Sequence, residues 1–260
     1  MTDDGRPAAN LPDPQRTLIH TNWAGLQHAY GPATDAPDLL SALLHPDQSA
    51  RTKALDGLHG TLHHQNTAYE ATVPAAQYVA AILLDPRTTR AVDKDRRSFP
   101  GCLRAELLQW IGSVADTVDD EAEAIDRRHG LSLTAYPPAA ALREIRPQLF
   151  AAAFSCTSDP DRDVREAAVA ACIPLLDDPS LLHHRAAMVP RLREVLGISA
   201  LWQYRERAID ALNAWGEDSS GIEGQQNPYE FCDADLSDHA SFGHSLGHRS
   251  ADGFSDDPPF

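Results

Sequence analysis

The residues with the clearest potential for chemistry are histidines. His59 and His63 stand four residues apart, so both would lie on one side of a helix, and imidazoles at that spacing can bind a metal ion. The HExxH arrangement of a zinc protease is missing from this stretch, and no third ligand is evident. We therefore expect no metal site here and interpret the pair as polar residues that a binding partner could contact.

The C-terminal segment holds a second histidine group, His239, His244 and His248, with Cys232 and Asp235 upstream. A histidine-rich tract can bind transition metals weakly, but this spacing matches no structural zinc site. The sequence also contains no GxSxG elbow, no glycine-rich phosphate loop and no paired-carboxylate signature. We expect neither a catalytic residue nor a cofactor, and hence a protein that is not an enzyme.

The stretch from Arg87 to Arg97 is the most basic in the chain. Long insertions between helices are often functional, so Arg96 and Arg97 are candidates for contact with an acidic partner. An ordinary solvated loop is the alternative.

Aromatic residues and arginines gather near position 204. Trp202, Tyr204 and Arg207 are of the types that dominate protein interfaces, which makes them candidate contacts. At helical spacing, Trp202 could equally cap the end of the core.

The charge of the chain argues against a nucleic-acid partner. The 260 residues carry a formal net charge of −16, whereas nucleic-acid binders present a basic face to phosphates. Residues 217–260 hold ten acidic residues and one arginine, and the remaining chain still has a net charge of −7. We expect another protein as the partner, and the charge favours a basic one.

Composition indicates a helical protein of a reducing compartment. Hydrophobic residues make up 42% of the chain, and alanine and leucine, which favour helices, are abundant. The cysteines form no CxxC pair, and Cys102, Cys156 and Cys172 fit core positions. No signal peptide or membrane span is recognisable, so we expect a cytoplasmic protein.

Hydrophobic periodicity predicts helices throughout residues 13–216. Asp13-Pro14 should start the first helix, and Gly31-Pro32 should end it. Pairs of amphipathic helices then follow, separated by insertions at 85–98 and 117–138, the second with its own short helix at 119–129. The pairs are 36–45 with 49–64, 73–84 with 99–115, 139–156 with 163–176, and 181–196 with 200–215.

The ends of the chain differ from this middle part. Residues 1–12 are polar, and we expect them to be flexible. Residues 217–260 have few aliphatic side chains, so we expect an acidic, disordered tail.

Two turn sequences, Pro46–Arg51 and Asp159–Ala168, resemble the turn and second-helix start of HEAT repeats. Pro147 and Pro190 match the bend that first helices of this family often contain. The segment around Trp23, together with 64–72, also resembles actinobacterial HEAT-repeat proteins of unassigned function. The resemblance covers residues 17–216 and implies an all-α solenoid of about four helix pairs behind an N-terminal helix.

The resemblance also implies a structural role for certain charged residues. In HEAT repeats, aspartate and arginine near the turn commonly form a ladder between repeats, and Asp47 with Arg51, and Asp161 with Arg165, have this placing. Contact with a partner is the alternative role for these residues.

A helical-repeat protein usually binds its partner on the concave face formed by its second helices. We therefore expect an adaptor, a scaffold or an inhibitor or immunity protein, of undetermined oligomeric state. The alternative is a HEAT-like DNA glycosylase or another nucleic-acid-binding repeat protein. That function requires a basic groove, but the second helices carry Asp56, Glu106, Glu166 and Asp210 at positions that we expect at the surface.

Overall fold

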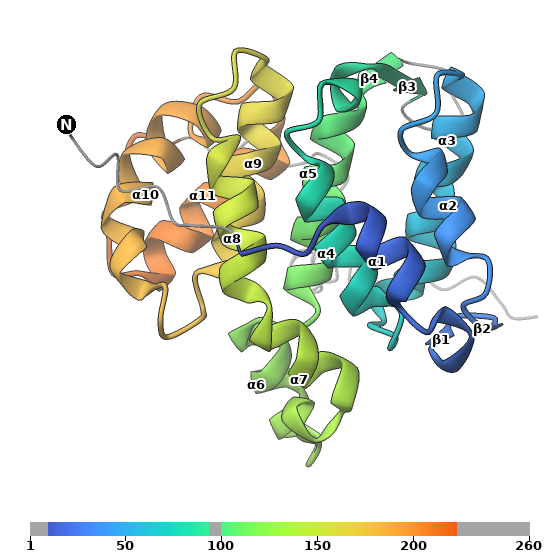
Figure 1. Ribbon diagram of the computed structural model, residues 1–260. Coiled ribbons are helices and arrows are strands. Elements are labelled where there is room, and N and C mark those ends of the chain that lie inside the picture. The colour runs from blue at the N-terminus through green and yellow to red at the C-terminus, as the bar shows by residue number, and fades with distance from the viewer. Residues whose placement is uncertain (1–9, 94–99, 223–260) are drawn as a thin grey trace, which may run out of the picture. The chain divides into compact units, whose positions relative to one another are not determined.

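The computed structural model describes residues 10–93 and 100–222 of a chain that divides into two units, Met1–Gly224 and Gln225–Phe260. Helices dominate the first unit, and the expectation of an all-α fold is confirmed (Figure 1). Two short antiparallel strand pairs accompany them: β1 (Gln27–His28) with β2 (Gly31–Pro32), and β3 (Ala91–Asp93) with β4 (Pro100–Cys102). Among the described residues, no helix is both long and apolar enough to span a bilayer.

The predicted helices are present, several of them shortened, and the helix expected at 139–156 is divided into two. The α-helices are α1 (Pro14–His20), α2 (Ala36–Ala42), α3 (Gln48–Gly57), α4 (Thr72–Ile82), α5 (Leu103–Asp116), α6 (Asp120–Arg128), α7 (Pro137–Glu144), α8 (Arg146–Ser155), α9 (Arg162–Leu175), α10 (Arg185–Arg191) and α11 (Trp202–Ala214). A π-helical turn, Leu58–Leu62, prolongs α3, and another, Leu192–Leu196, prolongs α10.

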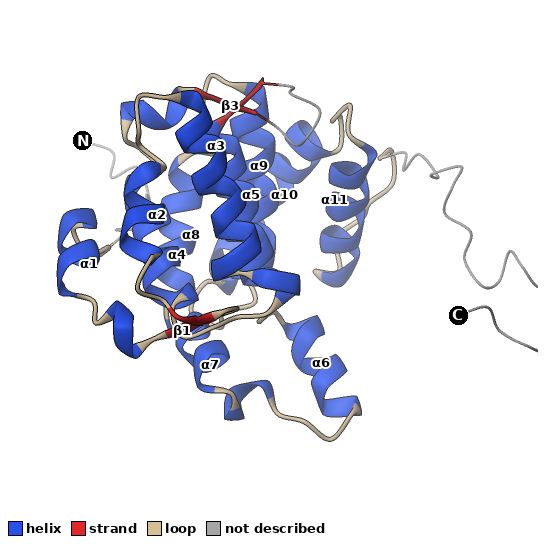
Figure 2. Ribbon diagram, turned by 90° about the vertical axis from the view of Figure 1, so that its right-hand side faces the viewer, coloured by secondary structure: helices blue, strands red, loops and turns tan. Residues whose placement is uncertain are grey.

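The helices pack in two layers. Helix α4 contacts α2 and α8 in one layer, whereas α9 contacts α5 and α11 in the other. The contacts α4–α5 and α8–α9 join the layers, so helices that follow one another along the chain pack against each other. Helices α6 and α7 project from one end of the packed helices in both ribbon views (Figures 1 and 2).

Among the described helices, α5 and α9 share the most extensive contact, and small residues allow it. A Cβ atom built on Gly112 of α5 would lie 3.3 Å from the Cα atom of Ala171. Ala167 and Ala168 of α9 are fully buried, as is Trp110 of α5. Close packing of this kind makes the contact sensitive to any added volume.

The N-terminal helix is shorter than predicted. We expected one helix to continue to Tyr30, but α1 ends at His20 and a 3-10 turn and the β1–β2 hairpin follow. Trp23 is buried, with its indole nitrogen donating to the Leu18 carbonyl at 3.2 Å, whereas Ile19 and Tyr30 are 71% and 72% exposed. The apolar spacing was misleading because these residues do not share one buried face.

The first insertion is partly structured. We expected a loop over 85–98, but Pro86–Thr89 forms a 3-10 turn and β3 pairs with β4. Asp93 fixes β3 to α3, since its backbone NH donates to Thr52 Oγ1 at 3.0 Å and its carboxylate accepts from Gln48 Nε2 at 2.8 Å. Arg96 and Arg97 lie outside the described residues.

The second insertion contains the expected helix. Asp119 caps α6 by accepting from the Ala122 NH at 2.7 Å, and Gly130 follows the helix with φ +74°. Arg143 of α7 binds this segment by donating hydrogen bonds to the Val118 carbonyl at 2.9 Å and to the Glu123 carboxylate at 2.6 Å. The inserted helix therefore has a defined position against α7.

Candidate binding face on α5, α9 and α11

Three hollows meet at Asp116, the last residue of α5. The central hollow has a volume of about 330 Å³ and lies between α5, α9 and α11. The acidic groove, of about 660 Å³, lies between the start of α6, the end of α9 and α11, and includes Asp119, Asp177, Trp202, Glu206 and Asp210. The arm hollow, also about 660 Å³, lies between α5, α6 and the segment from Asn66 to Ala68.

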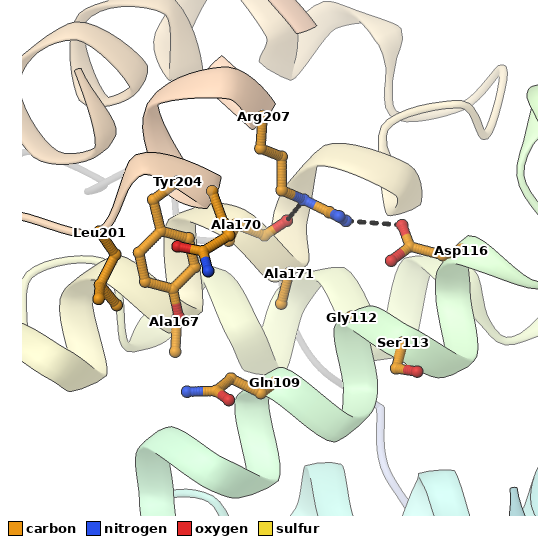
Figure 3. Close-up of a pocket in the computed structure, with 11 residues that line it drawn as sticks. Gln109, Gly112, Ser113, Asp116, Ala167, Ala170, Ala171, Leu201, Tyr204 and Arg207 are labelled. Atoms are coloured by element: carbon orange, nitrogen blue, oxygen red, sulfur yellow. Dashed lines mark hydrogen bonds and ion pairs between the residues drawn. The ribbon is translucent and has the colours of Figure 1, made fainter. Parts of the chain in front are cut away.

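The central hollow has a floor of small residues and an aromatic wall. Gly112 and Ser113 of α5 form this floor with Ala167, Ala170 and Ala171 of α9, and Tyr204 of α11 points toward Ala167 (Figure 3). These short side chains leave the hollow open above the close contact of α5 with α9.

Tyr204 forms the wall as a neutral phenol. Its side chain is half-buried, and burial, together with the negative charge of Glu166 and Glu106, raises the pKa of Tyr204 to about 12. The ring therefore offers an apolar face and a protonated hydroxyl at any physiological pH.

Arg207 crosses the junction of the hollows. Its Nη2 atom donates to Asp116 Oδ1 at 2.6 Å, and its Nε atom donates to the Ala170 carbonyl at 3.3 Å (Figure 3). We expected Arg207 to be available to a partner, but these bonds already engage it with α5 and α9. Arg207 therefore divides the central hollow from the acidic groove.

The acidic groove carries more carboxylates than cations. Seven acidic side chains line it, whereas Arg185 and Arg207 are its basic residues. Partial burial and the neighbouring carboxylates Asp116 and Asp120 raise the pKa values of Asp119 and Asp177, respectively. A cation entering the groove would relieve this repulsion.

The contacts of Arg185 illustrate how the groove can bind a guanidinium group. Its Nη2 atom donates to Asp177 Oδ1 at 3.0 Å, and its guanidinium carbon lies 5.4 Å from the centroid of the Trp215 ring. An arginine of a partner could form the same two contacts, an ion pair with a carboxylate and stacking on an aromatic ring. Trp202, Glu206 and Asp210 line the same groove.

The structure brings together only part of the predicted site. Trp202 and Tyr204 line the hollows with Arg207, as the aromatic cluster suggested. His59 and His63 belong to α3 and its π-helical turn and line none of the three hollows.

The two histidines do not face a common ligand. His59 is exposed, whereas His63 is 3% exposed and its ring lies edge-on to the ring of Trp110. Burial lowers the pKa of His63 to about 4, so the ring is neutral near pH 7. Within residues 10–93 and 100–222, no group of three or more His, Cys, Asp or Glu side chains is arranged to hold a metal ion.

Ser113 lies 3.5 Å from His63 Nδ1, measured from its Oγ atom. A nucleophile and its base are normally 2.6–3.2 Å apart, with a third group orienting the base. His63 Nε2 has no hydrogen-bond partner among the described residues. This pair therefore lacks the orienting contact that nucleophilic catalysis uses.

Arg51 and Arg165, at the two HEAT-like turns, bind backbone carbonyls. Arg51 Nη1 donates to the carbonyls of His45 and Pro46, both at 2.8 Å, and Arg165 Nη1 donates to those of Asp159 and Pro160 at 2.7 and 2.8 Å. Both arginines thus bind the turn that precedes their helix, and these bonds do not join them to Asp47 or Asp161.

The aspartates act instead as helix caps. Asp47 accepts from the Ala50 NH at 2.9 Å, and Asp161 accepts from the NH groups of Asp163 and Val164 at 2.9 and 3.3 Å. A carboxylate at the N-cap faces the first NH groups of its helix, which leaves the arginine to close the preceding turn.

A charged contact between neighbouring pairs comes from other residues. Arg104 at the start of α5 pairs with Asp159, which precedes α9, at 2.8 Å, and both side chains are nearly buried. A second buried contact joins Glu166 of α9 to Ser199 Oγ at 2.9 Å. Glu106 and Glu166, which we expected at the surface, are 9% and 3% exposed.

Sequence reasoning missed the acidic groove. The run Asp119-Asp120-Glu121 is typical of a solvated surface, and Asp116 and Asp177 stand in no recognisable motif. The charge run was a usable signal, but nothing in the local sequence indicates that Asp177, Glu206 and Asp210 gather beside it.

Comparison of the chain with protein-family models, with curated proteins and with solved structures finds no match.

Proposed function

We propose that this chain is a protein-binding module that holds a basic segment of another protein on the face formed by α5, α9 and α11. The observation that carries the proposal is the acidic groove, which is lined by seven acidic residues, two of them paired with arginines, and by Trp202, Tyr204 and Trp215. Aromatic side chains supply contact area at a low entropic cost, and the carboxylates would attract a cationic partner and orient it. The role is non-enzymatic: an adaptor, a scaffold or an inhibitor.

We propose further that the fold is a HEAT-type solenoid. The turn-closing arginines support this, because Arg51 and Arg165 bind carbonyls at the same two upstream positions of their turns. Arg205, at the start of α11, donates likewise to the Ser199 carbonyl. In such an array the second helices α5, α9 and α11 would line the binding face.

A nucleic-acid partner is the weaker candidate. Neutralising phosphates requires clustered basic residues, whereas the arginines of the acidic groove are already paired with Asp116 and Asp177. A polyanion would therefore meet mainly carboxylates on this face.

Site-specific photocrosslinking tests the proposal. A photoreactive amino acid replaces Gln203, which is exposed and lines both the central hollow and the acidic groove. The control carries it at Glu194, which is exposed and lines none of the three hollows. In cells that express the chain naturally, we expect a protein with a basic contact segment to crosslink from position 203 and not from position 194. Crosslinking to nucleic acid, or to no macromolecule from either position, would contradict the proposal.

A further inference from the structure

We infer that the arm hollow is an apolar subsite, and that the segment bound in the acidic groove places one apolar side chain in it. This inference rests on the proposed function and specifies the partner further. The bound segment would be extended and would carry an apolar residue next to basic ones.

The arm hollow has an apolar part and a polar part. Ile125 of α6, Leu133 and Tyr136 form the apolar part with three alanines, whereas the rest of the lining is polar and includes two carboxylates: Asn66, Thr67, Ser113, Asp116, Thr117 and Asp126. The volume of about 660 Å³ is ample for a single leucine or phenylalanine side chain.

Two large side chains of the hollow are only partly covered by the chain itself. Ile125 is 41% exposed and Tyr136 is 43% exposed. Ile125 is also unusual in its own helix, since α6 otherwise contains charged residues and alanine. Exposed apolar side chains that gather in a concavity mark a binding site more often than isolated ones do.

The hollow is formed before any partner arrives. The Tyr136 hydroxyl donates to the Ala68 carbonyl at 2.8 Å, which fixes the ring against the opposite wall. Gln65 and Asn66 both have left-handed backbone conformations, with φ of 49° and 53°, and Asn66 lines the hollow. Non-glycine residues in this region are strained, and such strain persists where the surrounding structure holds it.

The opposite wall is anchored to the core. The Thr72 hydroxyl donates to the Leu62 carbonyl at 2.5 Å, and the His63 NH donates to the Leu58 carbonyl at 3.0 Å. The segment with the two left-handed residues thus follows the π-helical turn Leu58–Leu62, whose two leucine side chains are buried. A wall held in this way loses little conformational entropy when a ligand binds.

Continuity with the other hollows identifies the occupant. Asp116 lines all three hollows, and Ser113 lines both the arm hollow and the central hollow. A segment leaving the acidic groove can therefore pass Asp116 with a cationic residue and reach Ile125 with an apolar one. The C-terminal part of this chain is a poor occupant, because residues 217–260 hold ten acidic residues and one arginine.

Synthetic peptides test the inference by fluorescence anisotropy. The first, the Arg/Leu peptide, has one leucine flanked on each side by arginines; the second, the Arg/Ser peptide, has serine in place of that leucine. The wild-type chain should bind the Arg/Leu peptide about tenfold more tightly, since burying a leucine side chain contributes on this scale. Ile125→Ser should reduce binding of the Arg/Leu peptide nearly to that of the Arg/Ser peptide and leave the latter unchanged.

Ile198→Ser is the matched control, because Ile198 is 72% exposed and lines none of the three hollows. The apolar subsite would be contradicted if wild type bound the two peptides equally, or if the two isoleucine variants changed the affinity for the Arg/Leu peptide equally. Either result would still be compatible with a basic partner. If neither peptide binds, the basic partner itself is wrong, and the inference falls with it.

Discussion

Arg207 Nη2 lies 2.6 Å from Asp116 Oδ1, although the two residues are 91 positions apart in the chain. This ion pair joins the last turn of α5 to α11 and stands where three hollows meet. Because Asp116 lines all three hollows, its ion pair with Arg207 reduces the negative charge that a bound partner would meet there. The same contact accounts for the position of Arg207, which faces α5 and α9 across the junction.

Breaking the Arg207–Asp116 pair should alter the binding face more than the stability of the fold. The two side chains are 31% and 40% exposed, and pairs of this exposure contribute about 0.2–1 kcal/mol. Urea unfolding of Arg207→Gln, Asp116→Asn and the double variant should give a coupling free energy in that range. A coupling of about 3 kcal/mol or more would show that the pair is a buried structural contact.

Removing Arg51 should destabilise the protein more than removing Arg165. Arg51 is 4% exposed and binds three carbonyls, including that of Ala91 at 2.6 Å, whereas Arg165 is half-buried and binds two. Arg51→Met should lower the free energy of unfolding by about 2 kcal/mol or more, and Arg165→Met by about 1 kcal/mol. Urea titration measures both, and equal losses would contradict the different burial of the two sites.

The sequence predicted local structure well where the signal was local. Asp13 caps the helix that its sequence context indicated, and α6 begins directly after Asp119, as expected of the short helix at 119–129. Gly216 follows α11 with φ +75°, a conformation that glycine commonly adopts at the end of a helix. A cap involves one turn of chain, so nearby residues are sufficient to predict it.

Features that depend on distant residues were predicted poorly. Trp23 has the spacing of a helical core residue, but a hairpin follows it instead of more helix. The acidic groove joins Asp119, Asp177 and Asp210, whose proximity results from helix packing. Spacing along the chain carries no information on which helices pack together. Trp202 and Tyr204 could therefore be predicted from their residue types, whereas the carboxylates near them could not.

Valine at position 112 should disrupt the α5–α9 contact. A Cβ atom there would already lie 3.3 Å from Ala171 Cα, and the larger side chain has no space. Gly112→Val should therefore cost about 1–3 kcal/mol in the free energy of unfolding. Gly60→Val is the matched control, because nothing lies within 4 Å of a Cβ atom built on Gly60. A thermal or urea unfolding series in which Gly60→Val costs as much as Gly112→Val would refute the packing argument.

Stability should fall as the pH drops, partly because of His63. The pKa of this ring is about 4 in the folded protein, so between about pH 6.5 and pH 4 the unfolded chain binds the proton and the folded chain does not. The unfolded state is therefore favoured as the pH falls through this window. From about pH 7 to about pH 5 the loss due to His63 should be about 2 kcal/mol.

Unfolding curves of His63→Leu at both pH values isolate this contribution. The variant should lose about 2 kcal/mol less than wild type over that range. His129→Leu, at an exposed position, should behave like wild type. An unchanged pH dependence in His63→Leu would show that the buried imidazole is not responsible.

The most direct test of the central claim is the affinity of the acidic groove for the Arg/Leu peptide. Glu206→Gln with Asp210→Asn removes two carboxylates from the groove, and Asp56→Asn with Glu194→Gln removes two from exposed positions outside the three hollows. At low salt, the groove variant should bind about tenfold more weakly than wild type, whereas the control should bind as wild type does. Equal weakening in both double variants would mean that only net charge attracts the peptide, and would contradict a binding site on α11.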